Sequence, residues 1–150
     1  TLGFGLLLLL ADKTNMTVRK IDHITFSGAL MIGLFQVLAL IPGTSRAGIT
    51  MTAARFLGIE RHDAARFSLL LSIPVILSAG TLKLFDIYTM GDIVLFRDAL
   101  TVAAFTFVIA IISIFFLMAW LRRASFTPFV IYRIVLGIIL LIISYWVPIV

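Results

Sequence analysis

A group of small and polar residues interrupts a long apolar run at positions 39 to 50, which read ALIPGTSRAGIT. A Pro-Gly turn followed by Thr44 or Ser45 as a cap predicts the start of a helix. The free N–H groups and the positive dipole end of a helix start attract anions, phosphate above all. Arg46 adds a planar guanidinium that can bind two phosphate oxygens. These residue types predict a phosphate-binding helix terminus.

The other members of this group suit the same chemistry. Thr44, Ser45 and Thr50 offer hydroxyl donors, and Thr50 follows Arg46 by one helical turn. Gly43 and Gly48 allow a ligand to approach the backbone. The alternative is a capped helix start whose arginine pairs with a lipid headgroup or a buried carboxylate. Because charge within a membrane is costly, we favour the functional interpretation.

The same residues nearly form a nucleotide-binding P-loop, with Gly43, four residues, Gly48, Ile49 and Thr50. Isoleucine replaces the lysine that reaches the β- and γ-phosphates, and neither the preceding strand nor the βαβ surroundings are present. Nucleotide hydrolysis is therefore disfavoured.

The elements that must position these residues belong to a membrane protein. The chain is 62% hydrophobic and 13% charged, with a mean hydropathy of +1.20. Residues 99–121 and 129–147 each come close to or exceed the length of about 20 residues that crosses a bilayer. Cysteine is absent, which excludes disulfides, thiolate metal sites and a cysteine nucleophile. A net charge of +5 would suggest nucleic acid for a soluble protein, but in a membrane protein its distribution matters more, and no nucleic-acid partner is expected.

We expect an all-α, polytopic membrane domain over residues 1–150. Residues 26–57 form a re-entrant helix hairpin that turns at Pro42 and Gly43, within the membrane thickness. Such broken helices often occur in pairs, which suggests one half of an inverted-repeat fold. The remaining expected elements are the cut end of a helix at 1–11, a polar loop at 12–24, a span at 63–85 interrupted at Pro74, a connection at 86–98, and the spans 99–121 and 129–147 joined by RRASFTP.

Basic residues set the expected orientation. They gather in the loop 12–24, around residues 55–66 and at 121–127, whereas the connection 86–98 is mostly acidic. We therefore expect the first three regions to face the cytoplasm and 86–98 to lie outside. His23 and His62 fall in cytoplasmic turns, where local pairing of Glu60, Arg61, Asp63 and Arg66 is favoured over a metal or acid-base site.

Three segments resemble the undecaprenyl pyrophosphate phosphatases, also called the bacitracin-resistance family. IGLFQVLALIPGTSRAGIT at 32–50 is similar to the family signature Pro-Gly-x-Ser-Arg-Ser-Gly-x-Thr, and RHDAARFSLLLSIP and RRASFTPFVIYRIVLG are similar to its downstream segments. Ala47 stands where the family usually has its second serine. The resemblance covers nearly the whole chain and matches the C-terminal half of the family.

The resemblance implies a hydrolase of the bacterial cell (inner) membrane that removes the terminal phosphate of undecaprenyl pyrophosphate for cell-wall synthesis. It implies a polyprenyl pyrophosphate substrate, a divalent cation such as Mg²⁺ or Ca²⁺, and phosphate binding by Ser45, Arg46 and Thr50. We expect Arg46 to be catalytic through charge stabilisation, and Gly43, Thr44, Ser45, Arg46, Gly48 and Thr50 to bind substrate, with no metal ligand assigned. Every carboxylate lies in a loop or helix end away from the motif, so the N-terminal half of the same protein would supply the acid-base groups.

Two other functions stay open. A transporter or flippase of an anionic lipid also aims broken helices at an anion, and release of phosphate distinguishes it from a phosphatase. A structural membrane subunit predicts that Arg46 can be replaced without effect. A homodimer is a further possibility.

Overall fold

The computed structural model describes residues 2–14, 20–91 and 93–146. These residues form helices and turns without a strand, as the all-α prediction requires. The elements are α1 (Leu2–Thr14), η1 (Ile21–His23), α2 (Phe26–Phe35), η2 (Gln36–Leu40), α3 (Arg46–Phe56), α4 (Arg61–Thr89), α5 (Ile93–Leu121) and α6 (Thr127–Trp146).

Three of the described helices, α4, α5 and α6, are long and apolar enough to cross a membrane. Their large hydrophobic side chains are mostly exposed, for example Ile93 (81%), Phe105 (69%) and Ile109 (62%). A protein in water could not leave so much apolar surface uncovered, whereas lipid covers it at no cost. The prediction of an all-α polytopic membrane protein is confirmed.

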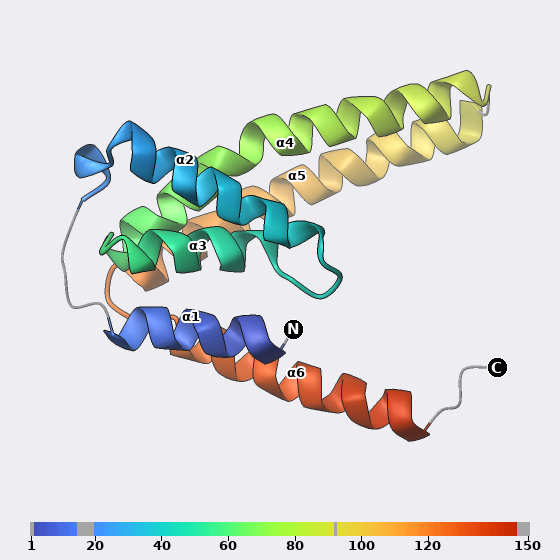
Figure 1. Ribbon diagram of the computed structural model, residues 1–150. Coiled ribbons are helices and arrows are strands. Elements are labelled where there is room, and N and C mark those ends of the chain that lie inside the picture. Colours follow the sequence, from blue (N-terminus) through green and yellow to red (C-terminus); the bar gives the residue numbers. More distant parts are fainter. Residues whose placement is uncertain (1, 15–19, 92, 147–150) are drawn as a thin grey trace.

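The short helices form the predicted hairpin. α2 and η2 run to the turn at 41–45, and α3 returns beside them (Figure 1). Thr25 caps α2 by accepting from the Gly28 N–H, and Ser45 caps α3 in the same way. The side chain of Ile32 is completely buried and packs with Ala53 and Ala54, whose small size lets the two arms approach closely.

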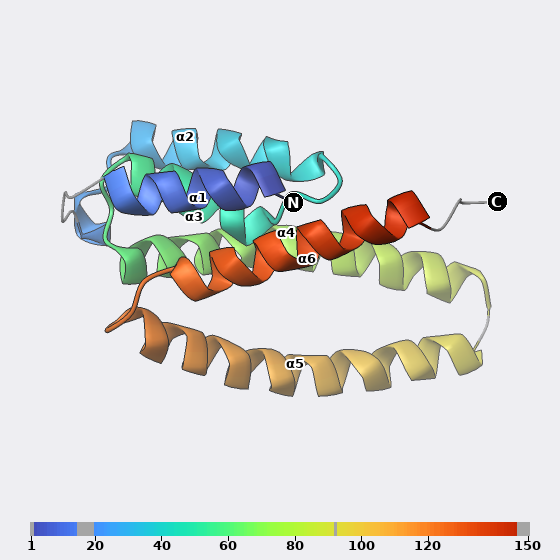
Figure 2. The same cartoon turned by 90° about the horizontal axis from the view of Figure 1, so that it is seen from below.

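The hairpin turn reaches about half-way along α4 in both views (Figures 1 and 2). Nη2 of Arg46 donates to the carbonyl of Leu71 at 3.1 Å. Leu71 comes about ten residues after the start of α4, or roughly 15 Å along its axis. α4 has 29 residues, so this contact places Arg46 more than a third of the way along that helix.

A buried ion cluster joins the first helix to the base of the hairpin. Asp12 Oδ1 lies 3.2 Å from Nε of Arg55 and 2.7 Å from Nε of Arg61, and the side chains of Asp12 and Arg55 are 3% and 6% exposed. Arg55 also donates to the backbone carbonyls of Asp12 and Ile59. The local pairing expected for Arg61 is therefore wrong, because its partner comes from α1.

Several predicted boundaries are corrected. The loop 12–24 begins too early, because Asp12 and Lys13 belong to the last turn of α1. The first arm of the hairpin is not one α-helix up to its turn, because it changes to a 3-10 helix at Gln36. Pro74 does not interrupt its span, since α4 is one continuous helix with Pro74 inside it. The connection 86–98 shrinks to a short turn, because α4 extends to Thr89 and α5 begins at Ile93.

The turns that the charge pattern assigns to the same side of the membrane lie at the same end of the molecule. The base of the hairpin, the start of α4 and the α5–α6 turn lie at one end of the molecule, and the α4–α5 turn lies at the other (Figures 1 and 2). Lys20 and Ser125 are therefore on one side. Within the connection 86–98 that is expected to lie outside, Asp92 is not among the described residues, whereas Met90 is described and is 71% exposed.

This arrangement predicts the outcome of cysteine labelling in the complete protein. Lys20→Cys and Ser125→Cys should react with an impermeant reagent only from the cytoplasmic side, and Met90→Cys only from the outside. Accessibility is measured in intact cells and in inverted vesicles. Labelling of all three from one side would contradict the assignment.

Candidate anion site at the start of α3

The turn before α3 presents its backbone to a ligand. Gly43 has φ +84°, a conformation that side chains rarely adopt. Ser45 is in an extended conformation, and its Oγ accepts from the Gly48 N–H at 3.1 Å. An α-helix leaves its first N–H groups without partners inside the helix. The N–H groups of Arg46 and Ala47 have the geometry to bind an anion, and the binding itself stays a prediction.

Arg46 projects from this helix start toward α4. Its guanidinium donates to the Leu71 carbonyl and forms no ion pair with any described residue. Its buried Nε has no hydrogen-bond partner among the described residues. The alternative in which Arg46 neutralises a buried carboxylate therefore has no support in the described chain. A guanidinium held only by a neutral carbonyl keeps most of its donors for an anionic ligand.

Thr50 is more enclosed than expected. It is 1% exposed, and its hydroxyl lies 2.6 Å from Oγ of Ser68 on α4 and within hydrogen-bond distance of the Arg46 carbonyl. These contacts fix the first turn of α3 against α4. A direct contact between Thr50 and substrate stays a prediction.

A second arginine, which the sequence-based assignment missed, approaches from α6. A Cβ added to Gly48 would lie 2.6 Å from Nη1 of Arg133, so the guanidinium rests directly on the backbone of α3. Arg133 forms no ion pair within the described residues. Ser45, Ala47, Gly48, Tyr132 and Arg133 share a cavity of about 330 Å³. The sequence feature that could have pointed to Arg133 is its position as a lone arginine inside the apolar span FVIYRIVLG.

The structure divides the predicted residues between two sides of α3. Ser45 and Gly48 face the cavity with Arg133, whereas Arg46 and Thr50 face α4. Thr44 lies in the turn between them, and its hydroxyl is buried without a partner among the described residues. A helix start with one arginine on each side suits an anion with two charged groups better than a single phosphate.

Acid-base groups lie elsewhere. His62 Nδ1 is 3.4 Å from Asp63 Oδ1, and Asp63 also accepts from the Ile21 N–H at 2.8 Å. With His23 in η1, these residues lie at the base of the hairpin, at the opposite end of α3 from Arg46. No three His, Asp or Glu side chains gather within the described ranges to hold a metal ion.

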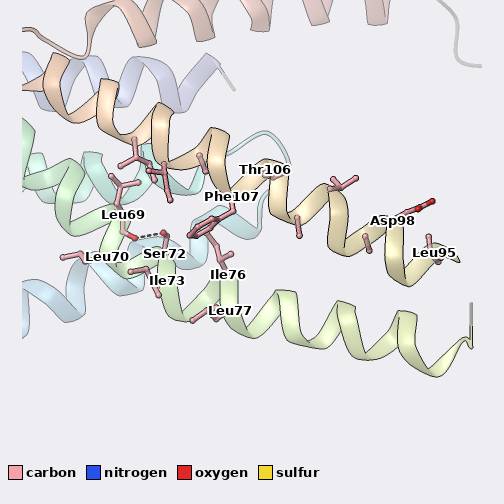
Figure 3. Close-up of a pocket in the computed structure, with 16 residues that line it drawn as sticks. Leu69, Leu70, Ser72, Ile73, Ile76, Leu77, Leu95, Asp98, Thr106 and Phe107 are labelled. Atoms are coloured by element: carbon pink, nitrogen blue, oxygen red, sulfur yellow. Dashed lines mark hydrogen bonds between the residues drawn. The ribbon is translucent and has the colours of Figure 1, made fainter. Parts of the chain in front are cut away.

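A larger groove between α4 and α5 has different chemistry. It encloses about 1020 Å³ and is lined almost entirely by apolar side chains such as Leu69, Ile73 and Ile76 (Figure 3). Its few polar residues are Ser72, Thr106 and Asp98, and Asp98 is an acid. The groove can therefore take hydrocarbon, but it does not suit phosphate.

These features define an all-α membrane protein whose helix hairpin presents a helix start and two arginines suited to an anion. The family described as Bacitracin resistance protein BacA matches residues 1–139, and the chain belongs to this family. The resemblance noted in the sequence is confirmed.

Named relatives share nearly half of the chain's residues. Undecaprenyl-diphosphatase 1 of Rhodospirillum rubrum is 49% identical over 99% of the chain and 52% of its own length. The undecaprenyl-diphosphatases of Roseobacter denitrificans and Alteromonas mediterranea are 46% and 50% identical, over 96% and 94% of the chain and 54% and 53% of their own lengths. The chain thus spans about half the length of the curated relatives it matches.

Proposed function

We propose that the complete protein hydrolyses undecaprenyl pyrophosphate to undecaprenyl phosphate in the bacterial inner membrane, as a multi-pass enzyme of lipid-carrier recycling. The observation that carries the proposal is the start of α3, where Arg46 contacts α4 and Arg133 approaches from α6, each at a point about two turns or more inside the ends of those apolar helices. The relatives named undecaprenyl-diphosphatase support the substrate class.

In this reaction, the oxygen of a nucleophile attacks the terminal phosphorus, and the bond from that phosphorus to the bridging oxygen breaks. Negative charge grows on the bridging oxygen and on the oxygens of the transferred group. Arg46 and the first N–H groups of α3 stabilise the charge on the transferred group, and Arg133 neutralises the phosphate that remains on the lipid. Ser45 orients the helix start as its cap.

The nucleophile and the acid-base groups of this reaction must come from outside the described residues. The buried carboxylate nearest in sequence to the motif, Asp63, lies at the other end of α3 and accepts a backbone hydrogen bond. We therefore place the nucleophile or base in an N-terminal half. No three His, Asp or Glu side chains of the described residues gather at this site, so a divalent cation would take its protein ligands from that N-terminal half, and no step is assigned to one. Association of two copies is a further proposal.

The experiment that tests the function measures phosphate release from a polyprenyl pyrophosphate by the complete protein in detergent. Release at a rate that falls with substitutions at the start of α3 supports hydrolysis. A protein that binds the lipid or moves it between leaflets without releasing phosphate would contradict it. No observation favours the transporter alternative.

Gly48→Ala tests the contact between α3 and Arg133 within this function. The added Cβ would displace the Arg133 guanidinium, whose Nη1 lies 2.6 Å from the Cβ position. We expect KM to rise about five- to tenfold, as for loss of one hydrogen bond to a charged group. Gly33→Ala is the matched control, because nothing lies within 4 Å of its Cβ position. Equal KM values in the two variants would show that Arg133 does not hold substrate.

A further inference from the structure

Three buried polar atoms of the hairpin have no hydrogen-bond partner among the described residues: Oε1 of Gln36, Oγ1 of Thr44 and Nε of Arg46. A buried polar group without a partner costs about 1–3 kcal/mol. Native proteins satisfy nearly all such groups, often with ordered water. Gln36 has no part in the site described above, so its buried amide oxygen calls for its own explanation.

The helix pattern places Gln36 on the face that meets α3. Ile32 is completely buried and packs with Ala53 and Ala54 of α3. Gln36 follows Ile32 by four residues, so it shares this face and lies one turn nearer to the hairpin turn. η2, which begins at Gln36, packs against α3. Since Ile32 packs with Ala53 and Ala54 of the returning helix α3, Gln36 lies between the two arms, about one helical turn from Arg46 at the start of α3.

The chemistry of the three atoms identifies what can join them. The Gln36 oxygen only accepts, Nε of Arg46 only donates, and the Thr44 hydroxyl can do either. A phosphate oxygen cannot satisfy the Gln36 oxygen, because both are acceptors. One water molecule can donate to Gln36 and Thr44 and accept from Arg46, which gives it the two to four partners that buried waters have.

We propose that Gln36 is a positioning residue that fixes the guanidinium of Arg46 through a water shared with Thr44. This inference rests on the proposed phosphatase function. Nη2 of Arg46 is already held by the Leu71 carbonyl at 3.1 Å. A second anchor at Nε prevents the guanidinium from rotating about that bond. Its remaining N–H groups then keep one direction, toward the anion at the start of α3.

A double-mutant cycle in the complete protein tests this role by phosphate release. Gln36→Met keeps the length of the side chain and removes the amide, and we expect kcat to fall about tenfold. In an Arg46→Lys protein no Nε remains to be anchored. The same Gln36→Met substitution should then change kcat by no more than about twofold. Leu38→Met, on the same 3-10 helix, is the matched control and should leave kcat unchanged in both backgrounds.

The outcomes separate the inference from the function it depends on. A similar loss in both backgrounds would show that Gln36 acts only through folding, and full activity of Gln36→Met would show that it has no role; either result overturns the inference while the phosphatase function stands. Absence of phosphate release by the unsubstituted protein would overturn the function, and the inference with it.

Discussion

Replacing Arg46 with lysine should lower phosphate release by the complete protein about a hundredfold, and replacing it with alanine should lower it further. Lysine keeps the charge but loses the planar fork that binds two oxygens. It also loses the bond that fixes the arginine on the Leu71 carbonyl. Loss of preorganised charge stabilisation of this kind costs on the order of 3 kcal/mol. The measurement is kcat for a polyprenyl pyrophosphate in detergent.

Ala47→Ser provides the matched variant for this comparison. Ala47 is exposed beside Arg46 and lines the cavity that contains Arg133. A serine there adds a hydroxyl donor without removing a contact, so activity should be equal or higher. Near-normal turnover by the Arg46→Ala protein would place the chemistry elsewhere. Substantial hydrolysis by residues 1–150 alone would show that the acid-base groups lie within this chain.

Asp12→Asn should destabilise the protein strongly, although Asp12 lies at the opposite end of α3 from Arg46. The substitution leaves Arg55, whose side chain is 6% exposed, without the carboxylate 3.2 Å away. Removal of one partner of a buried ion pair costs about 3–5 kcal/mol, because the other charge stays buried. Arg61, which also pairs with Asp12, loses its partner as well. The measurement is the thermal unfolding midpoint of the complete protein in detergent.

Asp86→Asn is the control for this prediction. Asp86 pairs with Lys83 at 3.5 Å, but their side chains are 55% and 82% exposed, so solvent screens the interaction. The thermal unfolding midpoint of the Asp86→Asn protein should stay close to that of the unsubstituted protein. If Asp12→Asn proves equally stable, the cluster does not hold α1 to the base of the hairpin.

The parts of the fold that follow local rules could be predicted from the sequence. The Pro-Gly turn, the Ser45 cap and the apolar lengths of the spans depend on residues close together in the chain, and the structure has all three. Pro74 misled the prediction because a long helix packed within a membrane protein can accommodate a proline. The connection 86–98 misled it because charged residues at the ends of α4 and α5 are helical, with exposed side chains.

The missed parts of the site depend on contacts between distant segments. Neither Arg133 against Gly48 nor Asp12 against Arg55 follows from any periodicity, because helix packing alone brings these residues together. The lone arginine in the apolar helix α6 indicates a functional or structural role for Arg133, but the sequence does not show which residues it contacts. The unpartnered oxygen of Gln36 is visible only when burial and hydrogen bonds are known together.

The most direct test of this account is a structure of the complete protein in lipid, with a polyprenyl bisphosphonate whose bridging oxygen is replaced by methylene. We predict that the terminal phosphonate accepts hydrogen bonds from the first N–H groups of α3 and from Arg46, and that the second phosphonate contacts Arg133. A headgroup bound away from α3, with Arg46 still held only by the Leu71 carbonyl, would contradict the proposed site.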